Sequence, residues 1–297
     1  MKTSDTAPPR SCEWIIDGLR FTGLAWGPTD GLPVLALHGW MDHAASFQEL
    51  APRLTGCHVV ALDLSGQGHS AHRAAHASYN IWDDIPQIVG LLDLLEWHDC
   101  VLLGHSRGAN IGALIAAALP ERVRALVSLD TIAPEPTEDN FVKTLRAYVT
   151  QSRQQFARPP RIFGSKADYI ERRRAQGNSP QVSEALSERA LEEVADGFRL
   201  RGDPRLFASS AVKLTQAHVE DVLRSIHCPV LNIWAKDGIK SHRPKLAELT
   251  RHAAGLIPRY DAIEIDGDHH FHMTPDGAEN IARAIAAFLA RECDARL

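Results

Sequence analysis

Short apolar segments recur along the first 130 residues and again after residue 228, and amphipathic stretches separate them. Alternation around the pair Asp17-Gly18 predicts a β-hairpin over residues 13–26. Buried strands are predicted at 34–37, 59–62, 101–103, 123–129, 229–235 and 261–265. Helices are predicted at 44–54, 81–97, 109–119, 244–255 and 276–291. This alternation predicts an α/β protein with a mostly parallel sheet flanked by helices, whose reactive groups lie at the carboxyl ends of the strands.

The alternation stops between residues 131 and 227. This stretch is mostly helical in composition, and prolines and glycines interrupt it at intervals. We therefore predict a core domain formed by residues 13–130 and 228–292, with residues 131–227 as a helical cap laid over the site. Residues 1–12 are polar and contain Pro8-Pro9, and we expect a loose N-terminal segment there.

One turn in this pattern indicates nucleophilic chemistry. The segment LLGHSRGA (102–109) places Ser106 between the end of a buried strand and the start of a small-residue helix. A tight turn of this kind lifts a serine hydroxyl clear of its neighbours, and glycines on both sides allow the close approach of strand and helix. The backbone N–H of Arg107, the next residue, would then lie near an oxyanion formed at Ser106.

A second oxyanion donor is expected from the loop after strand 34–37. Here Gly39 allows the backbone to bend, so the N–H of Trp40 is the candidate donor. His43, beside this loop, and His105, which precedes Ser106, are the candidate residues of the substrate pocket. For His38 we expect a hydrogen-bonded structural role.

A serine nucleophile requires a base, and the loop GDHHFH (267–272) offers three histidines. The motifs HGW, DLSGQGHS, GHSRG and GDHHFH, in this order, resemble those of an α/β-hydrolase. Within that fold the chain is most similar to the serine hydrolase-like family, through HGWMDHAASF (38–47), RGDPRLFASSAVKL (201–214) and GDHHFHM (267–273). The resemblance implies that His269 is the base, with His270 as the alternative and His272 supporting the loop.

The third member of the triad has two candidates. In most α/β-hydrolases the acid follows the strand after the cap, where Asp237 lies in IWAKDG, one residue early for the usual pattern. A minority, including the haloalkane dehalogenases, place the acid after the strand that follows the elbow helix, which is the position of Asp130. The resemblance favours Asp130, while Asp237-Gly238 also fits an ordinary turn.

Composition narrows the function classes. A formal net charge of -5 over 297 residues gives no reason to expect a nucleic-acid partner. The N-terminus lacks the apolar core of a signal peptide, and no uncharged apolar run approaches the length of a membrane span, so we expect a cytoplasmic protein. The five cysteines have no zinc-site spacing, and we expect neither a metal nor a cofactor.

These observations predict a serine hydrolase that attacks an ester-like carbonyl of a small molecule. Two alternatives remain open: a C–C bond hydrolase or cofactor-free peroxidase using the same triad, and a catalytically idle fold that serves as a binding module. Pocket specificity would come from cap residues such as Phe163, Tyr169 and Phe207. The run Arg172 to Arg174 is expected to form a solvated helix face.

Overall fold

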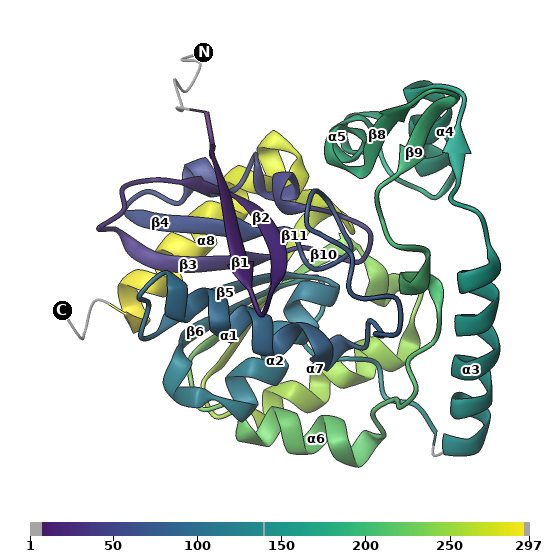
Figure 1. The fold of residues 1–297 in the computed structure, drawn as a ribbon. Helices are drawn as coiled ribbons and strands as arrows, with labels where there is room; N and C mark the ends of the chain where they lie inside the picture. The colour runs from purple at the N-terminus through teal and green to yellow at the C-terminus, as the bar shows by residue number, and fades with distance from the viewer. Residues whose placement is uncertain (1–7, 139, 294–297) are drawn as a thin grey trace.

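A computed structural model describes residues 8–138 and 140–293 of the chain. Its centre is an eight-stranded sheet with the strand order β1-β2-β4-β3-β5-β6-β10-β11 (Figure 1). The strands are β1 (Arg10–Ile16), β2 (Leu19–Trp26), β3 (Leu32–Leu37), β4 (Cys57–Leu62), β5 (Cys100–His105), β6 (Val123–Leu129), β10 (Val230–Asp237) and β11 (Tyr260–Asp268).

Strands β4, β3, β5, β6, β10 and β11 run parallel to one another, whereas β1 and β2 form an antiparallel hairpin at one edge of the sheet. The central strands β3, β4 and β5 are apolar and almost fully buried, as expected of parallel strands that are covered on both faces. This architecture confirms the predicted α/β fold with a mostly parallel sheet.

Two hydrophobic layers enclose the sheet. One layer packs it against α1 (Ile85–Leu94), α2 (Arg107–Ala118), α6 (Gln216–Ser225) and α7 (Pro244–Leu256). The other packs it against α8 (Pro275–Glu292) and the 3₁₀ helices η1 (Ala44–Phe47) and η2 (Ala51–Arg53). Further 3₁₀ turns are η3 (Ile81–Asp84), η4 (Pro120–Arg122), η6 (Ile239–Ser241) and η7 (Phe271–Met273).

The prediction of one helix over residues 44–54 is wrong, because this stretch forms the two short turns η1 and η2. Pro52 lies in the first turn of η2. A proline has no N–H and its ring clashes with the carbonyl four residues earlier, so a continuous helix could not pass through this position.

The segment between β6 and β10 contains both helices and strands. Its elements are α3 (Phe141–Ala157), β7 (Ile162–Phe163), α4 (Lys166–Ala175), α5 (Pro180–Ala190), β8 (Leu191–Val194), β9 (Gly197–Leu200), η5 (Pro204–Phe207) and α6. An antiparallel three-stranded sheet, β7-β9-β8, joins these helices and was not predicted. In Figure 1, α3, α4 and α5 stand to one side of the core, whereas α6 lies beside the core helices. Val219 and Leu223 of α6 are buried in the core layer.

Residues 1–12 were predicted to form a loose N-terminal segment, but residues 10–12 belong to the first strand of the sheet. Arg10 to Cys12 already belong to β1, where they pair with Ala25 to Gly23 of β2. Residues 1–7 lie outside the described part of the chain. Within the described part, none of the helices combines the length and the apolar character that crossing a membrane requires.

Candidate active site

Ser106 lies on a strained turn between β5 and α2. Its φ of 50° and ψ of -116° are rarely adopted by residues other than glycine. Both neighbouring glycines are required: a Cβ at Gly108 would lie 1.9 Å from the carbonyl oxygen of Leu37, and one at Gly104 would lie 2.4 Å from the backbone of Ala109. The close packing of strand and helix thus fixes the serine at the sheet edge and leaves it partly exposed.

The side chains of Ser106, His269 and Asp130 form a hydrogen-bonded chain. His269 Nδ1 lies 2.7 Å from Asp130 Oδ2, and its Nε2 lies 3.1 Å from Ser106 Oγ. Because a carboxylate can only accept, Nδ1 carries the proton and Nε2 accepts from the serine hydroxyl. Asp130 is fully buried, whereas the side chain of His269 is 28% exposed. This arrangement lets the histidine take a proton from the serine.

Asp130, and not Asp237, faces His269. Asp130 has a φ of 53°, and its carboxylate also accepts hydrogen bonds from the backbone N–H groups of Ala235 (3.1 Å) and Ile239 (2.8 Å). Asp237 is exposed at the end of β10. Its neighbour Gly238 makes room for the other acid, since a Cβ there would lie 2.2 Å from Asp130 Oδ1. The Asp-Gly pair is therefore the turn that seats Asp130.

The two candidate oxyanion donors follow the ends of neighbouring parallel strands, β3 and β5. Arg107 is the first residue of α2, so its backbone N–H has no carbonyl partner within the helix. Trp40 follows β3, and its indole Nε1 donates to the carbonyl oxygen of Leu206 at 3.2 Å. The Trp40 ring also contacts Phe207 edge to face, with centroids 5.0 Å apart. The indole therefore links this turn to η5.

His43 and His105, the two predicted pocket residues, are both fully buried. One ring nitrogen of each is turned to a backbone carbonyl: His43 Nε2 lies 3.1 Å from Leu186 O, and His105 Nε2 lies 2.8 Å from His269 O. Burial lowers the pKa of each to about 4. The contact with the carbonyl oxygen of His269 indicates that His105 supports the loop of the candidate base, and a pocket role for the two histidines stays a prediction.

A second group of polar side chains lies next to the hydrogen-bonded residues Ser106, His269 and Asp130. We call it the enclosed cluster, and it consists of Asp42, His105, His270 and Arg173. Asp42 Oδ2 lies 3.3 Å from His270 Nε2 and 3.5 Å from His105 Nδ1, and Arg173 Nη2 lies 3.3 Å from Asp42 Oδ1. Burial alone would raise the pKa of the Asp42 carboxyl, but the two histidines and Arg173 outweigh it and hold the pKa well below its usual range. Sequence reasoning missed Asp42, although it lies in the quoted HGWMDH segment.

The enclosed cluster has a donor set that could in principle hold a metal ion. The ligand atoms of Asp42, His105 and His270 lie within 4.8 Å of one another. The Arg173 guanidinium, however, already supplies a positive charge beside the carboxylate. His270, the alternative base, faces Asp42 here rather than Ser106.

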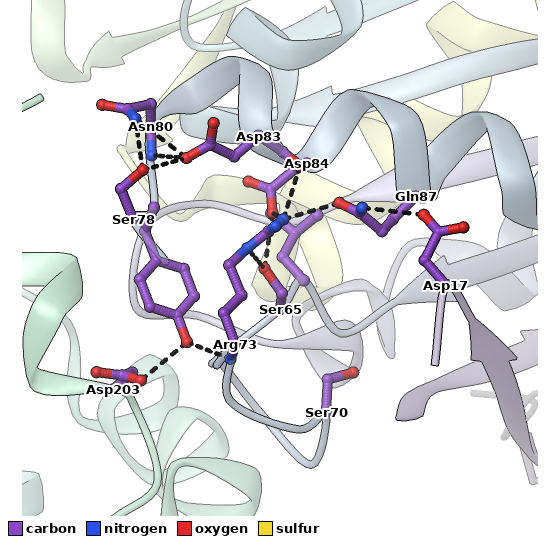
Figure 2. A network of polar contacts seen from close by, with 12 residues as sticks. Asp17, Ser65, Ser70, Arg73, Ser78, Asn80, Asp83, Asp84, Gln87 and Asp203 are labelled. Atoms are coloured by element: carbon purple, nitrogen blue, oxygen red, sulfur yellow. Dashed lines mark hydrogen bonds and ion pairs between the residues drawn. The ribbon is translucent and has the colours of Figure 1, made fainter. Parts of the chain in front are cut away.

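A polar network joins the segment between β4 and α1 to Arg107 at the start of α2. The Arg107 side chain pairs with Asp84 at 3.0 Å. Figure 2 shows that the Asp84 carboxylate accepts hydrogen bonds from Ser65, which belongs to the DLSGQGHS motif, and from Arg73. Arg73 also donates a hydrogen bond to Gln87. The Ser65 hydroxyl donates to Asp84 at 2.9 Å. The motif thus acts as a structural support of the loops around Ser106.

A cavity of about 260 Å³ lies between the Trp40 turn and the segment 155–207. Phe163, Tyr169 and Phe207, the three predicted specificity residues, all contribute to its lining. The three arginines of the run differ: Arg172 and Arg173 line this cavity, Arg173 also pairs with Asp42, and Arg174 pairs with Glu171. Only part of this run is therefore a solvated face.

Comparisons with known proteins cover most of the chain. The model of the alpha/beta hydrolase fold matches residues 33–276. A serine hydrolase-like protein of Dictyostelium discoideum is 29% identical over 293 residues, which cover 93% of this chain and 80% of the relative. Human serine hydrolase-like protein 2 is 29% identical over 283 residues, with 89% of each chain covered. The crystal structure of a hypothetical protein from Pseudomonas aeruginosa has a TM-score of 0.88 and 35% identity, covering 94% of this chain and 99% of that one.

Proposed function

Because this chain belongs to the alpha/beta hydrolase fold family, we propose that it is a serine hydrolase that cleaves an ester-like carbonyl of a small molecule through an acyl-enzyme on Ser106. The observation that carries the proposal is the unbroken chain from Ser106 Oγ through the His269 ring to Asp130. The serine hydrolase-like relatives are consistent with this chemistry.

The reaction follows from the positions of these groups. Ser106 Oγ attacks the carbonyl carbon while His269 Nε2 takes the hydroxyl proton. Asp130 holds the ring in the required tautomer and stabilises the imidazolium that forms. The imidazolium then returns the proton to the leaving group. A water molecule, deprotonated by the same nitrogen, then attacks the acyl carbon. As the bond to Ser106 Oγ breaks, the imidazolium returns the proton to Oγ, which releases the acid and restores Ser106 and His269.

Charge on the carbonyl oxygen requires stabilisation during both steps. The backbone N–H groups of Trp40 and Arg107 are the proposed donors, because both follow the ends of neighbouring parallel strands, β3 and β5. The strained backbone of Ser106 supports its role as the nucleophile, since backbone strain of this kind is concentrated at functional sites.

A neutral fluorophosphonate and intact-mass measurement test the proposal. We expect a single adduct on the wild-type protein, none on Ser106→Ala, and an unchanged adduct on Ser11→Ala, which alters an exposed serine of β1. A panel of esters would then define turnover. No adduct on a wild-type protein that is folded by circular dichroism would overturn the proposal and favour the idle binding module.

A further inference from the structure

The cavity next to the Trp40 turn combines an aromatic wall with a concentration of positive charge. Its wall includes Trp40, Phe163, Tyr169 and Phe207. Since the backbone N–H of Trp40 is a proposed oxyanion donor, a substrate held at Ser106 could extend past the indole into this cavity. Aromatic surfaces of this kind hold apolar parts of a ligand, while a few polar groups fix its orientation.

Four arginines contribute to the same lining, namely Arg158, Arg161, Arg172 and Arg173. Among the described residues that line the cavity there is no aspartate and no glutamate. The chain as a whole is acidic, with a formal net charge of -5. The charged residues that are described in the cavity lining are all arginines. The cavity is therefore positively charged, whereas the protein as a whole is negatively charged.

Within the described part of the chain, three of these arginines have no acidic partner. Arg173 pairs with Asp42, but Arg158, Arg161 and Arg172 form no ion pair with any carboxylate in residues 8–138 and 140–293. They come from different positions in the fold: Arg158 caps the end of α3, Arg161 precedes β7 and Arg172 lies in the last turn of α4. The fold thus brings three unneutralised guanidinium groups to one cavity.

These groups repel one another. The charge of Arg172, together with burial and the charge of Arg158, lowers the pKa of the Arg161 guanidinium from its ordinary value. The Arg161 guanidinium also lies over the Phe163 ring, 5.9 Å from its centroid, which places it at the aromatic wall. An anion bound between these side chains would remove the repulsion and accept hydrogen bonds from their planar donors.

We propose that this cavity binds an anionic group of the substrate, a carboxylate or a phosphate, while the aromatic wall holds the adjoining apolar part. The inference deepens the proposed function and rests on it, because it assumes that the substrate is also bound at Ser106. The anion can belong to the acyl group or to the leaving group, and paired substrates distinguish these two sources.

Two pairs of substrates share a reactive bond and differ in charge. For the acyl side the pair is p-nitrophenyl butyrate and the mono-p-nitrophenyl ester of glutaric acid. For the leaving group the pair is S-acetyl-N-acetylcysteamine and acetyl-coenzyme A. We expect kcat/KM to be higher for the anionic member of one pair by about tenfold, which is typical of one or two charge-assisted hydrogen bonds, and we expect added salt to reduce this preference.

The double variant Arg161→Ala/Arg172→Ala tests the role of the arginines. It should abolish the anionic preference, because KM of the anionic member rises far more than KM of the neutral member. Arg174→Ala is the matched control, since Arg174 lies on α4 and pairs with Glu171 at 2.6 Å instead of lining the cavity. Arg161→Glu should reverse the preference towards a cationic ester such as butyrylcholine. Equal rates for both members of both pairs, unaffected by the double variant, would overturn the proposal.

Binding to an inactive variant separates this inference from the proposed function. In Ser106→Ala, calorimetric titration with glutarate and with coenzyme A measures the anion site without turnover. If the fluorophosphonate does not label the wild type but one anion still binds and requires Arg161 and Arg172, the proposed function fails and the anion site stands. If labelling succeeds but neither binding nor rate depends on the two arginines, the anion site is wrong and the proposed function stands.

Discussion

Two carboxylate–histidine pairs lie side by side at the carboxyl edge of the sheet, and they differ in their access to solvent. In the pair Asp130–His269 the acid is buried, but the histidine is 28% exposed and its second nitrogen lies 3.1 Å from Ser106 Oγ. In the pair Asp42–His270 both residues are buried, and the acid also contacts Arg173. The residue types are the same, so it is their surroundings that distinguish the proposed catalytic pair, whose histidine reaches Ser106, from the enclosed pair.

The enclosed cluster contacts the pair Asp130–His269, which we call the open pair, through a backbone hydrogen bond and through the rings of His105 and His270, whose centroids lie 4.6 and 5.1 Å from that of His269. His105 Nε2 donates to the carbonyl oxygen of His269, the residue that carries the proposed base. Arg173 belongs to α4, outside the core layers of the sheet, so the cluster also fixes α4 to the loop that carries Trp40. Its proposed role is to position these loops, and the following tests separate that role from catalysis.

The largest expected effect comes from the open pair. Asp130→Asn should lower kcat/KM by about 10⁴ with little change in fold, because an amide does not stabilise the imidazolium and favours the wrong tautomer. Asp237→Asn is the matched control, since it alters an exposed acid at the end of β10, and it should stay within about twofold of the wild type. Steady-state kinetics with a reactive ester measure both variants.

The reverse result would exchange the two acids. If Asp237→Asn lost activity by orders of magnitude while Asp130→Asn retained it, the open pair would be the wrong assignment. The two aspartates follow adjacent parallel strands, β6 and β10, so either carboxylate could serve this edge of the sheet after a change of loop conformation.

The enclosed cluster should respond mainly in stability. Asp42→Asn leaves the Arg173 guanidinium without its carboxylate, and removal of one partner of a buried ion pair costs about 3–5 kcal/mol. We expect urea unfolding to show this loss, while kcat/KM of the folded variant falls far less than in Asp130→Asn. Adding Arg173→Met to Asp42→Asn should recover part of the stability, because it removes the unpaired charge.

A different division of effects would place Asp42 in the reaction itself. If Asp42→Asn cost less than about 1 kcal/mol in unfolding yet lowered kcat/KM as strongly as Asp130→Asn, the enclosed cluster would take part in proton transfer. Asp266→Asn provides the surface reference, because Asp266 pairs with Lys236 in solvent.

Local sequence patterns predicted the elements that depend on neighbouring residues. The hairpin around Asp17-Gly18, the parallel strands and the turn at Ser106 are signals of short range, and the structure contains all of them. The β7-β9-β8 sheet was missed because β7 has two residues and β8 and β9 have four each, which is too short for alternation to stand out from helical composition.

Contacts between distant residues could not be predicted in this way. Asp42 and Arg173 are 131 positions apart, and no local pattern connects them. The choice between Asp130 and Asp237 likewise depends on which side chain turns towards His269. The left-handed backbone of Asp130 and the N–H groups of the β10 turn decide this orientation, and neither leaves a clear mark in one sequence.

The smallest expected effect is a change in the pH dependence of stability at His43, which adjoins the enclosed cluster. Burial lowers the pKa of His43 to about 4, so between pH 6.5 and 4 the unfolded chain binds a proton there that the folded chain does not. Acidification through this window must therefore lower the free energy of unfolding. His43→Gln should reduce that slope by up to about 1.4 kcal/mol per pH unit, whereas His76→Gln, at an exposed loop position, should leave it unchanged. Urea unfolding at several pH values measures the slope of the unfolding free energy against pH for each variant. Equal slopes for the wild type and His43→Gln would mean that the folded histidine titrates as freely as an exposed one. The enclosure that distinguishes this side of the site from the open pair would then be absent in solution.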